Sequence, residues 1–205
     1  MCVELLDARN DAHLCSHRYD RKVAYLFAIQ IEIARTIAYQ LQAKLSPGVG
    51  AAIDRPPTNS MAAYALYLDA RKVLQDPSVG ANMGTNWAKA EELLKAAIQH
   101  DPNFVLAYCE LASIDDDRYW NEFDHTPECL ARADAAVETA TRLAPDLGEV
   151  HLARANHFYH GYRQYAWARA EFALAKAKLP NEPRVSSFIG VLDRPEGLWA
   201  SAANH

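Results

Sequence analysis

Three histidines and three tyrosines lie within fifteen residues, from His151 to Tyr165. Imidazole could supply metal ligands or a proton-transfer group, because it binds metals and titrates near neutral pH. On a helix of 3.6 residues per turn, His157 lies about 240° and His160 about 180° around the axis from His151. Only His157 and His160 therefore share a face, and no glutamate or cysteine completes a site such as H-E-x-x-H. The spacing favours packing or groove lining; a small-ligand or zinc site at these two histidines is the weaker alternative.

Other candidate chemical groups are weaker. The run Asp115 to Asp117 lacks the spacing of a calcium loop and an apolar wall that would shift a pKa, so it predicts a solvated, acidic helix end. The stretch that begins at Gly48, GVGAAI, follows a predicted helix, whereas a dinucleotide-binding loop follows a strand. Cys109 has no neighbouring base in the sequence to activate it. We therefore expect no enzyme activity, no cofactor and no metal.

Composition limits the classes of partner that the chain can bind and indicates its cellular compartment. The 205 residues are half apolar and carry a net charge of -5. Such a chain has no basic field for nucleic acid or an anionic membrane surface. Its four cysteines form no C-x-x-C pair, as in reduced cytoplasmic proteins. No apolar run approaches the roughly 18 residues of a membrane helix, so we expect a cytoplasmic chain without nucleic-acid or membrane partners.

One half-repeat occurs three times, with the pattern A-x3-Φ-x2-A-x4-P, where Φ is a large apolar residue. Positions three and four apart share a helix face, so each copy predicts an amphipathic helix whose alanines allow close packing and whose proline ends it. A further helix is expected to start near Phe104, near Gly148 and near Pro183. We predict that the repeat positions form the core: Ala90, Leu94 and Ala97; Ala133, Val137 and Ala140; Ala168, Phe172 and Ala175.

The three prolines, at positions 102, 145 and 180, are 43 and 35 residues apart. The second spacing is close to the roughly 34-residue period of tetratricopeptide repeats. The longer spacing predicts an inserted loop from Asp115 to Glu128, with Thr126 capping the next helix and Pro127 in its first turn. A similar loop, DPSVGANMGTN, is expected to separate the two helices of the first repeat.

The pattern resembles that of tetratricopeptide repeat (TPR) proteins. Tyr108, Leu111 and Ala112 match the first helix of the second repeat, and Ala155 and Phe158 fit the third. The third repeat departs from the pattern at His151 and Arg154, and a fourth starts at Ser186 and stops. The resemblance implies an all-α TPR superhelix of about three repeats plus a partial fourth over residues 59–205, with Tyr108, Phe158, Phe172 and Trp167 in its core.

A narrower resemblance covers the amino-terminal part. LLDARNDAHLCSHRYDR, then FAIQIEIARTIAYQL and AYALYLDAR, is similar to the junction of a TolB-like α/β domain with TPRs in bacterial multidomain regulators. Those regulators often carry a class III adenylate cyclase or an OmpR-type winged helix. Residues 1–20 would be a hairpin remnant of the TolB-like domain, consistent with alternating apolar residues on both sides of Asn10 and Asp11. Residues 21–58 would be a long amphipathic helix, from Arg21 to Leu45, and a linker.

First helices of TPRs line a concave groove, and the resemblance assigns groove positions to this chain. Such a groove would suit a protein or peptide with basic and apolar residues. The lysine and asparagine clamp for carboxyl-terminal peptides is not matched, since Cys109 and Leu152 stand where lysine is needed. Besides Leu106 and Cys109, the expected groove residues are Ser113, Asp116, Asp117, Glu149, Leu152, Asn156, Tyr159 and His160.

The resulting expectation is a non-catalytic protein-interaction module, the regulatory or sensory part of a bacterial signalling protein. Three alternatives stay open. The chain could be an oligomerisation module that forms a homodimer through exposed repeat ends, because stacked repeats leave an unpaired face at each end. It could be a truncated fragment with no function of its own. It could also be the regulatory region of an adenylate cyclase.

Overall fold

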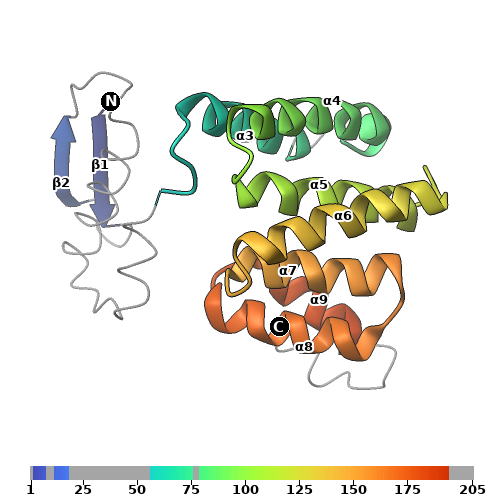
Figure 1. Cartoon of the computed structure of the whole chain (residues 1–205). Helices are drawn as coiled ribbons and strands as arrows, with labels where there is room; N and C mark the ends of the chain where they lie inside the picture. Colours follow the sequence, from blue (N-terminus) through green and yellow to red (C-terminus); the bar gives the residue numbers. More distant parts are fainter. Residues whose placement is uncertain (1, 8–11, 19–55, 76–78, 194–205) are drawn as a thin grey trace. The chain divides into compact units, whose positions relative to one another are not determined.

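The computed structural model describes residues 2–7, 12–18, 56–75 and 79–193 (Figure 1). The chain divides into two compact units, Met1–Asn59 and Ser60–His205. The predicted helix from Arg21 to Leu45 and most of the predicted linker lie outside the described residues.

In the first unit, two strands form an antiparallel pair. Strand β1 covers Cys2–Asp7 and strand β2 covers Ala12–Arg18. The register pairs Cys2 with Arg18 and Asp7 with Ala12, and it shifts between Leu5 and Leu6. The alternating sequence predicts strands in the same two stretches. Their origin as a remnant of a larger α/β domain stays a prediction.

Every regular element described in the second unit is a helix, which confirms the all-α class for this part of the chain. A short π-helical stretch, His157–Gly161, continues directly from α7; we call it the π segment. Among the described helices, none combines the length and apolarity needed to cross a membrane. The α-helices are α3 Met61–Leu74, α4 Val79–His100, α5 Val105–Trp120, α6 Pro127–Leu143, α7 Gly148–Asn156, α8 Tyr165–Lys178 and α9 Pro183–Asp193.

Successive helices pack as hairpins. The most extensive contacts join α3 with α4, α5 with α6, and α7 with α8. Figure 1 shows these pairs stacked one after another, with α9 packed against α8. The first helices α5 and α7 also contact each other across neighbouring hairpins. The arrangement brings residues 23 to 41 positions apart in the chain into one interface, as the hydrogen-bonded residues below show.

Helix ends follow local signals in the sequence. Thr126 Oγ1 accepts a hydrogen bond from the Cys129 amide at 3.2 Å, and Pro127 occupies the first position of α6, which confirms both predictions. Helices α4, α6 and α8 each end two residues before the proline of the half-repeat. Two loop predictions are wrong, however. Helix α5 extends to Trp120, through the first part of the expected insertion, and α4 already begins at Val79.

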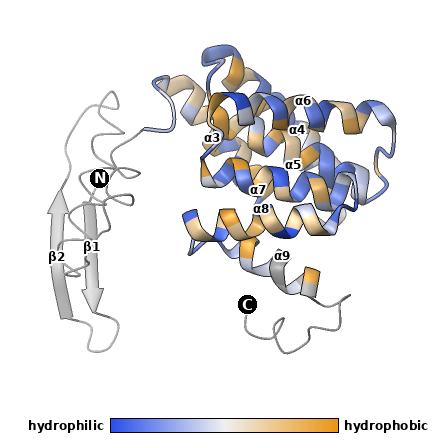
Figure 2. Ribbon diagram, turned by 60° about the horizontal axis from the view of Figure 1, so that its bottom comes forward, coloured by the Kyte–Doolittle hydropathy of each residue, from blue (hydrophilic) through white to orange (hydrophobic). Residues whose placement is uncertain are grey.

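The predicted core positions lie inside the helical unit. Figure 2 shows apolar and hydrophilic residues alternating along the helices, as a helix with one buried face requires. Four of the positions, Tyr108, Leu111, Val137 and Phe158, are only partly buried. The buried ones are Ala90, Leu94, Ala97, Ala112, Ala133, Ala140, Ala155, Ala168, Phe172 and Ala175.

The placement of Trp167 in the core is wrong. Its exposed fraction is 64%, whereas its neighbour Ala168 is fully buried. The buried face of α8 runs through Ala168, Phe172 and Ala175, and Trp167 lies one residue, about 100°, away from that face. Its ring touches only the edge of the unit, at Phe158, with 6.2 Å between ring centroids.

Candidate functional site

Buried titratable residues gather where α5 and α6 meet α7 and the π segment. Helix α5 contributes Asp116 and the π segment contributes His157, both buried, and α6 contributes Asp134, whose side chain is 48% exposed. In the described part of the chain, buried side-chain atoms without a hydrogen-bond partner occur only here, on Asp116, Asn156 and His160. We take this polar interface as the candidate functional site.

The acidic run Asp115 to Asp117 is not the solvated helix end that we predict. Asp116 is fully buried and Asp115 nearly so, because α5 continues for another turn and carries both into the interface with later helices. Asp115 accepts hydrogen bonds from Arg118 at 3.1 Å and from Arg132 at 3.1 and 3.3 Å. The charge-assisted bonds from Arg132 join α5 to α6, whereas the bond from Arg118 lies within α5.

His157 is held between two carboxylates. Its Nδ1 lies 2.7 Å from Asp116 Oδ1, and its Nε2 lies 2.8 Å from Asp134 Oδ1. A carboxylate oxygen only accepts hydrogen bonds, so with both aspartates ionised each ring nitrogen carries a proton and His157 is an imidazolium. Burial of the ring opposes that charge, but the bonds to Asp116 and Asp134 outweigh it and raise the pKa of His157. His157 thus ties α5, α6 and the π segment together.

Tyr162 extends this network toward solvent. Its hydroxyl donates to the Asp134 carboxylate, with Oη 2.9 and 2.8 Å from the two oxygens. Burial and the hydrogen bond to Asp134 raise the pKa of Tyr162 to about 12. The ring also packs edge-on against His157, with 5.1 Å between centroids. Tyr162 therefore stays protonated near neutral pH and holds Asp134 in place for His157.

The π segment positions these rings, and Gly161 lies in its last turn. A Cβ atom at Gly161 would lie 2.8 Å from Leu130 Cδ1 and 3.3 Å from His157 Nδ1 and Asp116 Oδ1. A side chain at this position would therefore require the Leu130 side chain to move. π-Helical turns are frequent at functional sites, because the extra residue shifts the side chains that follow it.

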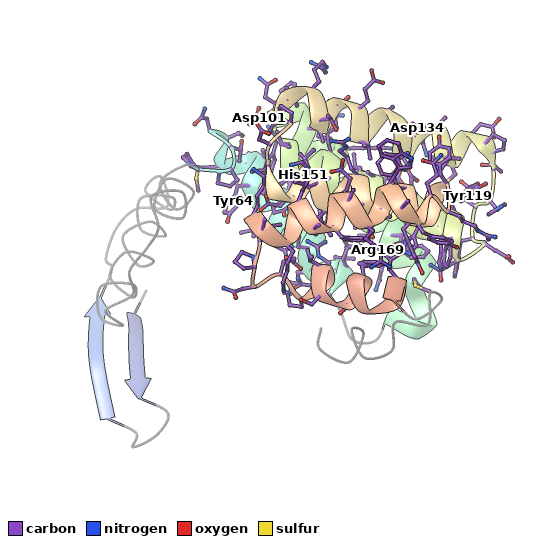
Figure 3. The ribbon with its side chains drawn as sticks, turned by 90° about the horizontal axis from the view of Figure 1, so that it is seen from below. Tyr64, Asp101, Tyr119, Asp134, His151 and Arg169 are labelled. Atoms are coloured by element: carbon purple, nitrogen blue, oxygen red, sulfur yellow. The ribbon has the colours of Figure 1, made fainter. Side chains whose placement is uncertain are left out.

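The three histidines of this region lie against different carboxylates. His151 Nδ1 lies 2.7 Å from Glu171 Oε2, and Arg154 binds the other oxygen of Glu171 at 2.8 Å, so this group joins α7 to α8. His160 Nδ1 lies 3.0 Å from Asp117 Oδ1, without the angle of a hydrogen bond. Figure 3 shows His151 and Asp134, the partner of His157, at separate places along the helices.

Beside the histidine network, Asp116 Oδ2, Asn156 Oδ1 and His160 Nδ1 are buried without a hydrogen-bond partner. Burial raises the pKa of Asp116, against the hydrogen bond from His157. Leaving such atoms unpaired costs about 1–3 kcal/mol each. These unpaired atoms therefore make the interface less stable than a fully hydrogen-bonded interface would be.

Aromatic rings close the inner end of the interface. The Trp120 ring lies 4.9 Å from His160 and 5.3 Å from Tyr159, between centroids. Phe188 of α9 packs on Tyr159 at 5.9 Å and stacks on Phe172 at 5.2 Å. These rings cover His160 and Tyr159 on the side of α9.

The structure buries most of the predicted groove residues. Among the accessible ones, Ser113 and Glu149 are half-buried, and the Asp117 side chain is 36% exposed. The expectation that the others face a partner is wrong, because α5 packs against α7 and the π segment through them. Whether these three and the half-buried Leu106 bind a partner stays a prediction. The buried groove positions are Asp116, Leu152, Asn156, Tyr159 and His160, together with Cys109.

The imidazole of His157 can hold a proton at this interface. The two described cysteines of the helical unit, Cys109 and Cys129, are poor nucleophiles. Asp116 and Asp134 bind opposite ring nitrogens of His157, so their carboxylates do not converge on one point. Among the described residues, no group of three His, Cys, Asp or Glu side chains could hold one metal ion. Burial, with Glu110 nearby, raises the pKa of Cys109 far above its usual range. Burial and Asp115 raise that of Cys129 to about 12, so both thiols stay protonated.

Sequence reasoning identified Asp116 and His157 but paired neither with its partner, and it missed Asp134, Tyr162 and Glu171. For Asp134, the sequence does contain a weak indication. Asp134 follows the repeat alanine Ala133 on the next helical position, so it must lie near the edge of the buried face of α6. A carboxylate at such an edge needs a donor, but the sequence does not say which helix provides it.

Comparison with known proteins gives a partial match. No protein-family model matches the chain. Over 142 residues, 67% of this chain, it is 27% identical to a protein of Rhizobium meliloti (strain 1021) named "Putative adenylate cyclase 3". The match covers 23% of that protein, so the chain spans about a quarter of its relative's length. This similarity points to a signalling context for the chain.

Proposed function

We propose that this chain is a TPR-type protein-interaction module, the regulatory part of a cytoplasmic signalling protein that resembles a multidomain adenylate cyclase. The module has no catalysis of its own. Its first unit derives from a TolB-like domain, of which the strand pair β1–β2 would be a remnant.

One observation carries the proposal. The small residues of the half-repeat occupy the buried face of α4, α6 and α8, so each second helix packs closely on the first helix of its own hairpin. Stacked hairpins of this kind leave the faces of their first helices for partners. The distant similarity to a cyclase supports the signalling context.

The accessible groove positions indicate the chemistry of the partner. Asp117 and Glu149 carry negative charge beside half-buried Ser113 and Leu106 on the first helices α5 and α7. Close by, Glu110 of α5 lies 3.5 Å from Arg184 of α9, so a carboxylate of this face already binds an arginine. The groove would therefore bind a peptide or protein segment with basic and apolar residues.

Selection of peptides from a phage-displayed library on the full chain tests this proposal. We expect enriched peptides with basic residues, and loss of their binding to a groove variant, Ser113→Arg with Glu149→Arg. The matched control, Ala131→Arg with Glu138→Arg, adds the same charges at exposed positions of α6 and should bind normally. No enrichment, or equal loss in both variants, would overturn the proposal.

A further inference from the structure

The outward face of α8 is apolar along its whole length. Trp167 and Leu174 are 64% and 46% exposed, and the alanines at 166, 170, 173 and 177 are exposed as well. Figure 2 shows α8 at the near side of the helical unit, with apolar colouring along much of it. A continuous apolar face at the surface of a soluble unit marks an interaction site.

The charged residues of α8 point elsewhere. Arg169 donates to the Leu192 carbonyl at 3.2 Å, and Lys176 donates to Ser186 at 2.7 Å, both on α9. Glu171 is buried and bound by His151 and Arg154. Three of the four charged side chains are thus engaged within the unit, and Lys178 lies at the end of the helix.

The exposed apolar residues follow the spacing of a helix–helix seam. Trp167, Ala170, Leu174 and Ala177 are separated by three, four and three residues, which is the a–d–a–d spacing of coiled coils. This seam, which we call the α8 seam, lies opposite the buried face through Ala168, Phe172 and Ala175. This spacing lets a second helix pack along the exposed face of α8.

The order of large and small side chains along the α8 seam indicates which helix fits against it. Along the α8 seam a large residue alternates with alanine. If a second copy of α8 packs antiparallel about a two-fold axis at Phe172, Trp167 faces Ala177 and Ala170 faces Leu174. Each large side chain then fills the space over a small one, as close packing requires. A parallel pairing would place Trp167 on Trp167 and alanine on alanine, leaving gaps.

We propose that the α8 seam is a homodimer interface, in which two copies of this chain pair antiparallel through α8. In this register Lys178 faces Ala166 of the second copy, so no like charges meet. The interface is isologous, as in most two-fold dimers. Because the proposed interface uses one face of a single helix, we expect a weak dimer, with a Kd of about micromolar or weaker.

Sedimentation velocity of the full chain over a range of concentrations tests the proposal. We expect a reversible dimer. Ala170→Glu would bury a carboxylate against Leu174 of the second copy and should weaken dimerisation at least about tenfold. The matched control Ala135→Glu, at an exposed alanine of α6, should dimerise as the natural chain does. A monomer at all concentrations, or unchanged dimerisation of Ala170→Glu, would overturn it.

Exchanging the large and small residues tests the register. Ala177→Trp alone sets tryptophan against tryptophan and should weaken the dimer. Combining Trp167→Ala with Ala177→Trp restores one large residue opposite each small one and should recover it. Failure of the double variant to recover dimerisation, with helicity unchanged by circular dichroism, would refute the antiparallel pairing and favour a different partner on this face.

Discussion

The first two hairpins and the last two are joined by different chemistry. Where α4 and α5 meet, Phe104 and Leu94 are fully buried, and Phe104 packs edge-on against Tyr67 at 5.1 Å. Where α5 and α6 meet α7 and the π segment, His157 binds Asp116 and Asp134 beside a small apolar cluster that includes Cys109 and Val150. We call these the apolar junction and the polar junction. An ion pair between Arg118 and Glu91 also crosses the apolar junction, near its rim.

The contrast shows how one repeat pattern can serve two purposes. An apolar junction gains free energy from buried area and accepts many arrangements of similar volume. A polar junction gains little net stability, because burying charges costs about as much as pairing them returns. It does require a defined arrangement of its helices, since each donor must meet one acceptor. Its stability also depends on pH.

The largest expected effect comes from breaking the apolar junction. Phe104→Ala should lower the free energy of unfolding by about 3–5 kcal/mol, because it removes a fully buried ring. Urea unfolding followed by circular dichroism measures the loss. Leu68→Ala, at a residue that is 41% exposed, is the control and should cost less than about 1 kcal/mol. Equal losses would show that the apolar junction is not a core.

Breaking the polar junction should cost somewhat less. Asp116→Ala leaves the buried side of His157 without its acceptor, so we expect a loss of about 3 kcal/mol in the same assay. Asp134→Ala removes a carboxylate that is 48% exposed and should cost only about 1 kcal/mol. A larger loss for Asp134→Ala than for Asp116→Ala would contradict the importance of burial.

Raising the pH from mildly acidic to mildly alkaline values should weaken the polar junction and spare the apolar one. The pKa of His157 is raised in the folded chain, so its contribution is fully present below its ordinary pKa near 6.5 and is lost as pH rises through the folded pKa. The raised pKa of Asp116 acts in the same direction. Unfolding free energies at a series of pH values should therefore fall toward alkaline pH.

His157→Gln provides the control for this pH dependence. Glutamine keeps hydrogen-bonding capacity without titrating, so the fall in stability with rising pH should flatten. Phe104→Ala should leave the fall unchanged, since it lowers stability equally at every pH. A slope that persists in His157→Gln would assign it to other groups.

The smallest effect concerns the helix that carries Asp134. Thr126→Ala removes the side-chain cap of α6 and should cost about 1 kcal/mol. Thr85→Ala, at an exposed position inside α4, is the matched control and should change stability by less than about 0.5 kcal/mol. Thermal unfolding of both variants gives the comparison. No difference between them would mean that water replaces the cap.

The sequence alone determined the periodic features of this protein. The alternation of alanine with a large apolar residue, ended by proline, located α4, α6 and α8 and their buried faces. Thr126 and Pro127 located the start of α6. These features follow from the 3.6-residue turn and from local backbone chemistry, which act within a few residues of the chain.

Only the tertiary structure decided which polar groups meet. Asp116 and His157 are 41 positions apart, and their bond depends on how hairpins stack and on the extra residue of the π segment. An aspartate run is predicted to be solvated from sequence alone, because the sequence does not show that another helix covers it. Local pattern reports which residues share a face; the partner of that face is set by packing between distant segments.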